Sequence, residues 1–243
     1  MRALKIIHTS DLHGKLNRRR AEALRFCREQ SGALLLDSGD AVSAGNFYVR
    51  PGGEPVIERM NLAGYQAMAV GNREYHFRKR GLLSKTRRAR FEVLSANLLP
   101  RENGLGHIRR WSVLVTGAGP VGVFGLTPTM IAPGTWLERL SDLRFLSWRE
   151  AAQEAVEALR GEVAWLLALS HLGLEQDVRL ARICPDLDLI LGGHSHLEQE
   201  ETVVEGSVAI SHAGHHASHA AIVDLLRAAD GTTRIERRLV DLG

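Results

Sequence analysis

Short apolar runs alternate with segments of helical periodicity along most of the chain. Six runs have the length and composition of buried strands. They lie at residues 3–8, 33–36, 66–70, 91–95, 163–169 and 187–191. Four further segments carry apolar residues at helical spacing or helix start and stop signals. These lie at residues 17–30, 55–63, 147–161 and 175–183.

The ends of these predicted helices carry suitable residue types. Asn17 can cap the first helix, and Gly32 stands just past its end. Pro55 suits the first turn of the second helix. Ser147 and Glu150 have the spacing of a capping box, which predicts a third helix start at this point.

Two other regions are rich in strand signals. Residues 107–127 are typical of two strands joined by GAGP in a hairpin, and strand patterns dominate from residue 200 onward. We find no repeat, low-complexity tract or linker in the 243 residues. We therefore predict a single α/β domain over residues 1–243, with mixed or parallel sheets.

The composition mainly indicates the cellular compartment in which the protein is expected. The chain is 44% hydrophobic and 24% charged, and no apolar run approaches the roughly 18 residues of a membrane span. The first residues lack the long apolar region of a signal peptide, so we expect a cytoplasmic protein that begins at Met1. Cys27 and Cys184 lie outside any CxxC pattern, and we expect both to be buried, reduced thiols.

The charge balance is weakly informative. A net charge of +3 and a pI of about 9.1 suggest anionic substrates without establishing them. One stretch, RKRGLLSKTRRAR at residues 78–90, is strongly basic. It is typical of a solvated helix face, which is the favoured interpretation, and the alternative is a cationic rim that attracts phosphate.

Side chains that can bind metals follow five of the predicted strands within a few residues. The motifs TSDLHG, DSGD, GN, SH and GGHSH stand at these positions. In an open α/β sheet, the carboxyl ends of the strands line one crevice. The candidate ligands at these ends are Asp11, His13, Asp40, Asn72, His171, His194 and His196.

Each motif taken alone has a simpler interpretation. An isolated DxH is usually a helix cap or a surface pair, GN after a strand is usually a turn, and GHSH can be a flexible loop. Five such motifs at strand ends are hard to attribute to chance. Carboxylate, imidazole and amide donors suit Zn²⁺, Mn²⁺ or Fe²⁺ better than Ca²⁺. Their number predicts two divalent ions about 3.5–4 Å apart that share a bridging carboxylate.

This motif set resembles that of the calcineurin-like metallophosphoesterases, and within them the catalytic domain of 5′-nucleotidases. The family pattern is DxH, GD, GNH followed by an acid, a lone His after a strand, and GHxH. The matching motifs here are DLH (11–13), GD (39–40), GNRE (71–74), SHLG (170–173) and GHSH (193–196). KIIHTSDLHG and LDLILGGHSH are similar to the nucleotidase branch in particular.

The resemblance implies a four-layer α-β-β-α sandwich of two mixed sheets, with two metal ions where the strands end. For the first ion it implies the ligands Asp11, His13 and His196. For the second ion it implies Asn72, His171 and His194, and Asp40 is the implied bridge between the two ions. It also implies a phosphoester hydrolase, with a bridging hydroxide as the nucleophile and nucleotides or related small phosphoesters as substrates.

Two positions depart from the family pattern. The histidine of GNH is Arg73 here, and the acid of the nucleotidase motif GNHEFD is His76. Arg73 cannot act as a general acid because its pKa exceeds about 12, but it can donate charged hydrogen bonds to a phosphate. His76 is either a substitute proton donor or a surface histidine. Some small bacterial members of the superfamily also lack the GNH histidine and remain phosphodiesterases.

Nucleotidases also carry a carboxyl-terminal domain that grips the nucleoside base. This chain ends with the catalytic domain, so we do not expect base specificity to be inherited. His8 and Asp37 precede ligand motifs and are expected either to orient the ligands or to be buried structurally. The ISHAGHH segment, which contains His212, is expected to be either a loop that supports the ligands or faces the substrate, or a solvent-exposed loop.

We therefore weigh three functions. The leading one is a two-metal phosphoesterase acting on a small phosphoester or nucleotide, and the second is a metal-binding scaffold with impaired catalysis. The third is a nuclease, suggested by residues 78–90 but weakened by a net charge of only +3. We expect no membrane partner. The sequence leaves the oligomeric state, the metal identities and the preference for monoesters or diesters open.

Overall fold

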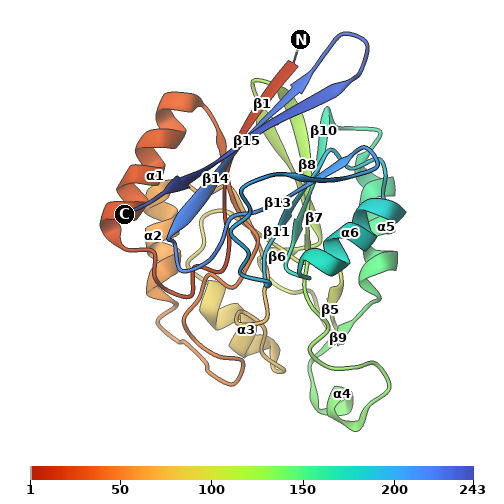
Figure 1. Ribbon diagram of the computed structural model, residues 1–243. Coiled ribbons are helices and arrows are strands. Elements are labelled where there is room, and N and C mark those ends of the chain that lie inside the picture. Colours follow the sequence, from red (N-terminus) through yellow and green to blue (C-terminus); the bar gives the residue numbers. More distant parts are fainter. Residues whose placement is uncertain (1) are drawn as a thin grey trace.

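Two mixed β-sheets form the centre of the molecule (Figure 1). The computed structural model describes residues 2–243. In spatial order, the first sheet contains β15 (Thr233–Asp241), β14 (His219–Arg227), β1 (Arg2–Thr9), β2 (Leu34–Asp37), β3 (Ala67–Ala69), β4 (Glu92–Leu94) and β6 (Ile108–Arg109). The second contains β12 (Val203–Glu205), β13 (Val208–His212), β11 (Leu189–Gly192), β10 (Trp165–Ser170), β8 (Gly119–Leu126) and β7 (Trp111–Thr116).

Helices cover the outer face of each sheet (Figure 1). The helices on the side of the first sheet are α1 (Arg18–Ser31), α2 (Pro55–Ala63) and α3 (Lys79–Thr86). Those on the second sheet are α5 (Trp148–Leu159) and α6 (Leu174–Ile183). A short helix, α4 (Trp136–Leu140), projects from one end of the molecule.

Three apolar cores separate these layers. On β1, Leu4 and Ile6 point into the core between the two sheets, where they meet Leu167 of β10. Ile7 points the other way and packs in the same core as Leu24 of α1. Because β1 is covered on both faces, it needs a nearly continuous apolar run. A third core lies between the second sheet and α5 and α6, so the predicted four-layer sandwich is confirmed.

Of the two side chains predicted to cap the start of a helix, Asn17 and Ser147, only Asn17 does so. The side chain of Asn17 accepts a hydrogen bond from the Arg20 N–H at 2.9 Å, and Gly32 ends α1 in the left-handed region with φ 66°. The predicted capping box at Ser147 is wrong: helix α5 does begin there, but Ser147 makes no side-chain capping hydrogen bond. Both Ser147 and Glu150 are exposed, where water can satisfy the first N–H groups of the helix.

The segment between β4 and α5 contains elements that the sequence pattern missed. The strands β5 (Leu98–Pro100) and β9 (Leu143–Phe145) pair in an antiparallel two-stranded sheet. The helix α4 lies in the loop between β8 and β9. Each of these elements has five residues or fewer, which is too short to show a clear period.

The cysteines match their prediction only in part. Both thiols are free, and Cys184 is buried as expected. The predicted burial of Cys27 is wrong, because it lies on the exposed side of α1, whose buried residues are Ala21 and Leu24. In residues 2–243, no helix has both the length and the apolar character needed to cross a membrane.

Parallel pairing brings the ends of several strands together. In the first sheet β1, β2, β3 and β4 are mutually parallel neighbours, and in the second sheet β8, β10, β11 and β13 are. The loop that follows β1 is bonded to the loop that follows β2, since the Asp11 N–H donates to the Gly39 carbonyl at 3.0 Å. The carboxyl ends of these strands therefore form a common edge.

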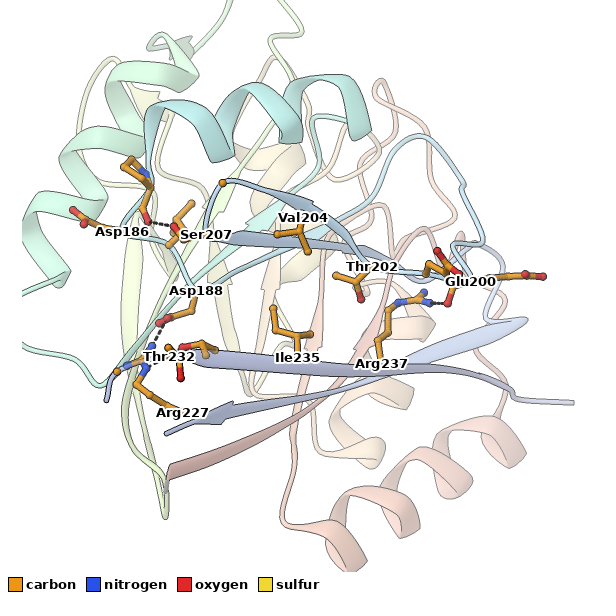
Figure 2. A pocket seen from close by; sticks show the side chains of 16 residues that line it. Asp186, Asp188, Glu200, Thr202, Val204, Ser207, Arg227, Thr232, Ile235 and Arg237 are labelled. Atoms are coloured by element: carbon orange, nitrogen blue, oxygen red, sulfur yellow. Dashed lines mark hydrogen bonds and ion pairs between the residues drawn. The ribbon is translucent and has the colours of Figure 1, made fainter. Parts of the chain in front are cut away.

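A large groove lies elsewhere. It has a volume of about 1060 Å³ and runs between β12 and β15, which belong to different sheets (Figure 2). Arg227 pairs with Asp188 at one end, and Arg237 donates to the Glu200 carbonyl at the other. The groove is lined mainly by polar side chains, and none of the seven predicted ligands borders it.

Candidate metal centre

All seven predicted ligands stand on loops that leave the common edge of the parallel strands. Asp11 and His13 follow β1, Asp40 follows β2, and Asn72 follows β3. His171 follows β10, and the remaining two, His194 and His196, follow β11. The structure brings them together from both sheets. Five of them form two clusters that share Asp11, and the other two, Asn72 and His194, lie beside His171 of the inner cluster.

The outer cluster consists of Asp11, His13 and His196. His196 Nε2 lies 3.3 Å from Asp11 Oδ1 and 3.2 Å from His13 Nε2. His13 Nε2 lies 3.6 Å from the same Asp11 oxygen. His196 is exposed, so this cluster opens to solvent.

The inner cluster is more deeply buried and centres on His171. Its Nε2 lies 3.4 Å from Asp40 Oδ1, 3.2 Å from Asn72 Oδ1 and 3.8 Å from Asp11 Oδ1. The imidazole of His194 approaches the same ring, with centroids 5.1 Å apart. Asp11, rather than the predicted bridge Asp40, is the carboxylate that both clusters share in this structure.

The backbone is strained at these loops. In residues 2–243, eight residues other than glycine have a positive φ, and five of them are predicted ligands. They are Asp11, His13, Asp40, His194 and His196, with φ between 47° and 70°. A side chain with a β-carbon rarely adopts this conformation, and such strain concentrates at functional sites.

The donor atoms fit a divalent cation. Asp11 Oδ1 is buried and accepts no hydrogen bond from the described residues, although it faces several imidazole nitrogens. A buried carboxylate oxygen without a donor needs a compensating positive charge. Gly71 preserves the space, because a β-carbon there would overlap Asp40. Imidazole, carboxylate and amide donors match Zn²⁺, Mn²⁺ or Fe²⁺.

The clustered charges shift the acidity of their neighbours. Burial alone would lower the pKa of His171, but the Asp40 and Asp11 carboxylates raise this pKa to about 9. Burial opposes ionisation of Asp40, yet the nearby His171 holds the pKa of Asp40 below its usual range. The two carboxylates therefore favour the protonated form of His171, and metal binding to its Nε2 would compete with this proton.

A buried carboxylate fixes the loops of the inner cluster. Glu74 accepts hydrogen bonds from the N–H groups of Asp40 (2.9 Å), Val42 (3.0 Å) and Gly71 (2.8 Å). Burial and the neighbouring Asp40 charge raise the pKa of Glu74. One side chain thus joins the loop that carries Asp40 to the loop that carries Asn72.

A buried lysine binds the backbone of the same region through three carbonyls. Lys85 of α3 donates to the carbonyls of Gly45 (3.0 Å), Arg73 (2.6 Å) and Tyr75 (2.9 Å). Burial lowers the pKa of Lys85 to about 8. The favoured interpretation of residues 78–90 as a solvated face is therefore wrong at Lys85, because this side chain is buried and its ammonium is paired with three carbonyls.

The loop of His194 and His196 is held by a different device. Ser195 Oγ lies 3.1 Å from His212 Nδ1, and His212 Nε2 lies 2.8 Å from Asp177 Oδ2. Asp177 and His212 are buried, and a β-carbon at Gly192 would overlap both. This Ser195–His212–Asp177 relay connects the loop after β11 to β13 and α6, so His212 faces the protein interior and not solvent.

His8 and Asp37 also support the ligands. His8 Nε2 lies 3.0 Å from Ser38 Oγ, and the Ser38 carbonyl lies 2.8 Å from His171 Nδ1. This contact holds His171 so that Nε2 faces the inner cluster. Asp37 accepts the N–H of Gly39 at 2.9 Å. Both residues act on the loop after β2, and neither belongs to the two ligand clusters.

Arg73 lies beside the inner cluster. Its N–H donates to Asp40 Oδ1 at 2.7 Å, and its guanidinium Nε lies 3.8 Å from Asp40 Oδ2. The guanidinium Nη1 donates to the Ser43 carbonyl at 3.3 Å. The side chain is partly exposed, so its remaining N–H groups are available to a ligand.

His76 has different surroundings. Its ring packs against Gly81 and stacks on Phe77, and its Nδ1 accepts the Arg78 N–H at 2.8 Å. The prediction of a surface histidine is wrong because the ring is buried. In the described chain no hydrogen bond or ion pair joins His76 to Arg73 or to the predicted ligands, so the structure lends no support to His76 as a proton donor.

Comparison with known proteins places this centre in a family. The calcineurin-like phosphoesterase profile matches residues 4–198. The chain belongs to this family. The predicted class, a metal-dependent phosphoric ester hydrolase, agrees with it.

The chain is also similar to 5′-nucleotidases. It is 31% identical over 221 residues to a snake venom 5′-nucleotidase of Gloydius brevicauda, covering 79% of this chain and 37% of the relative. Identity to the 5′-nucleotidase of Rattus norvegicus is also 31%, covering 79% and 38%. A 5′-nucleotidase precursor of Thermus thermophilus has a similar structure, with a TM-score of 0.82 and 25% identity over 98% of this chain and 54% of that one. The chain therefore spans well under two thirds of the length of these relatives.

Proposed function

We propose that this chain hydrolyses phosphate esters with two divalent ions, held by the seven residues described above. One ion is assigned to the outer cluster, and the second to His171, Asn72 and His194. Asp11 or Asp40 is the shared carboxylate. The observation that carries this proposal is the buried Asp11 oxygen, which lies without a hydrogen bond between the two clusters.

Two ions held there supply Lewis acidity toward the phosphoryl group and acidify the attacking water. The protein supplies position and charge. Glu74, Lys85 and the Ser195–His212–Asp177 relay hold the ligand loops, while Arg73 donates charged hydrogen bonds to the phosphoryl oxygens. Arg73 is the only cationic side chain that we assign to the phosphoryl oxygens.

Small phosphoesters are the proposed substrates, with nucleotides and their cyclic or diester relatives first among them. Similarity to 5′-nucleotidases over 79% of the chain supports this choice. The metal-free protein should be restored with Mn²⁺, Zn²⁺ or Fe²⁺ separately and assayed with an aryl monoester, an aryl diester and a nucleotide panel. The absence of turnover under every condition would instead favour a binding scaffold.

The Asp40→Asn variant tests the metal centre. The amide keeps the shape but removes a negative charge from the inner cluster, so turnover should fall by at least about 10³-fold. Metal analysis should show a parallel loss of bound ions. Asp230→Asn is a suitable control because Asp230 is exposed in the turn between β14 and β15. Full turnover in Asp40→Asn would rule the proposal out.

The Arg73→His variant tests the departure from the family motif. If Arg73 binds the phosphoryl group, the loss of charged hydrogen bonds should lower kcat/KM by about 10–100-fold. Arg73→Lys keeps the charge but loses the planar fork, so its loss should be smaller. A gain in rate in Arg73→His would mean that the chain lacks an acid and that Arg73 is not a phosphate ligand.

A further inference from the structure

An apolar cavity of about 310 Å³ lies among three loops. Its walls include Phe47 from the loop after β2, Phe77 from the loop after β3, and Leu137 and Leu140 of α4. Of the lining residues, only Asn46 and Tyr75 have a polar group in the side chain. Neither the proposed metal ligands nor Arg73 lines it.

Two loops link this cavity to the candidate metal centre. The ammonium of Lys85 binds the carbonyls of Gly45, Arg73 and Tyr75 together. The loop that presents Arg73 to the centre therefore continues directly into the cavity wall at Tyr75. The segment before α4 also starts at the common strand edge, since Thr127 Oγ1 donates to the Val70 carbonyl at 2.7 Å. The cavity and the proposed metal centre are thus built from the same end of the sheets.

The cavity is bordered by apolar side chains that face solvent. Phe47 is 82% exposed, and Leu137 and Leu140 are 47% and 50% exposed. Single exposed apolar residues are ordinary, but their concentration around one apolar cavity marks a binding surface.

We propose that this cavity binds the apolar leaving group of the phosphoester, an aromatic ring or short aliphatic chain, while the phosphoryl group lies at Arg73. This inference rests on the proposed function and changes the order of its substrates, because it places aryl and short alkyl phosphates before nucleotides. The volume is near the lower end for small-molecule pockets, which suits one substituted ring. A nucleobase is a poorer occupant, because most of its polar edge atoms would be left without partners.

A series of phosphate monoesters tests this proposal on the metal-loaded protein. Phenyl, 4-methylphenyl and 4-propylphenyl phosphate have leaving groups of nearly equal acidity and increasing apolar area. If the cavity holds the leaving group, kcat/KM should rise about three- to fourfold for each added carbon that becomes buried. A flat series would overturn the inference while leaving phosphoester hydrolysis intact.

The double variant Leu137→Ser/Leu140→Ser should flatten the gradient, and both sites are exposed enough to accept serine. The readout is the ratio of 4-propylphenyl to phenyl phosphate within each protein, which cancels changes in overall activity. Phe26→Ser is the matched control, because Phe26 is an exposed apolar residue on α1 outside the cavity. An undiminished ratio in the double variant would contradict the assignment.

Binding measurements separate this inference from the proposed function. The affinities of benzylphosphonate and 4-propylbenzylphosphonate, which cannot be hydrolysed, should show the same gradient by calorimetry. A gradient in affinity without any turnover would remove the proposed hydrolysis and keep the apolar site. Turnover with equal affinities for both phosphonates would do the reverse.

Discussion

The two sides of the candidate metal centre are held by different kinds of contact. The loops of Asp40 and Asn72 are fixed by two buried charged groups, Glu74 and Lys85, which satisfy three N–H and three carbonyl groups. The loop of His194 and His196 is fixed by the Ser195–His212–Asp177 relay and is itself exposed. The loops of Asp40 and Asn72 are thus tied at six backbone positions by these two side chains. The loop of His194 and His196 has the relay and a contact to a ligand, in which the His194 N–H donates to Asp11 Oδ2 at 3.0 Å.

Because of this difference, the two sets of loops should respond differently to the removal of metal. Buried, charge-assisted hydrogen bonds are stronger than neutral ones and costly to remove. The inner loops should therefore keep their geometry without metal, whereas the outer loop depends more on its relay. On titration with a chelator, we expect the outer ion to leave before the inner one.

The largest effect should come from Glu74→Gln. The glutamine amide has one oxygen and an NH₂ group, so at least one buried N–H loses its acceptor and a donor faces a donor. The free energy of unfolding should fall by about 3 kcal/mol, as measured by denaturant titration. Glu157→Gln, an exposed position on α5, is the matched control. Equal stability of the two variants would show that the inner loops do not depend on Glu74.

A smaller effect is expected for Asp177→Asn on the outer side. Asp177 accepts hydrogen bonds from Ser170 and faces His212 Nε2, and asparagine can replace only part of this set. Supporting residues of this kind typically contribute about 10–100-fold to metal affinity. We expect a loss near the lower limit that is larger for the ion released first by the chelator, because the loop held by the relay carries a ligand of each ion. Glu175→Gln on the same helix should have no effect, and a larger loss of the inner ion would contradict this expectation.

The smallest predicted effect concerns pH. Burial, together with the His212 and Arg237 charges, lowers the pKa of His8 from 6.5 to about 3. Below pH 6.5 the unfolded chain takes up a proton at His8 that the folded protein does not, so stability falls as the pH falls toward 3.

This contribution amounts to about 0.8 kcal/mol at pH 6 and increases at lower pH. His8→Gln should remove it, with unfolding measured in chelator for both proteins so that metal binding does not contribute. Identical pH profiles of wild type and variant would show that His8 is not held neutral.

Much of the architecture could be predicted from local pattern. The run ALKIIH predicted a buried strand, and Asn17 and Gly32 marked both ends of α1 correctly. The placement of polar residues after five strands predicted which side chains would meet, because parallel strands share an edge. The short elements β5, β9 and α4 lacked enough residues for a period to appear.

The supporting residues could not be predicted in the same way. Lys85 stands in a basic run that is typical of a solvated face, and its burial depends on carbonyls 10 to 40 residues away. Asp177 meets His212 across 35 residues, and nothing in the α6 sequence indicates this contact. Glu74 stands next to Arg73, but its three N–H partners come from two loops. These roles arise from tertiary contacts that local patterns do not record.

The measurement that tests the dinuclear centre most directly is electron paramagnetic resonance of the metal-free protein titrated with Mn²⁺. Two ions that share a carboxylate should give a stoichiometry of two per chain and an exchange-coupled spectrum, which Asp40→Asn should abolish or weaken. A stoichiometry of one, or two ions with uncoupled spectra, would contradict a shared carboxylate between the inner and outer clusters.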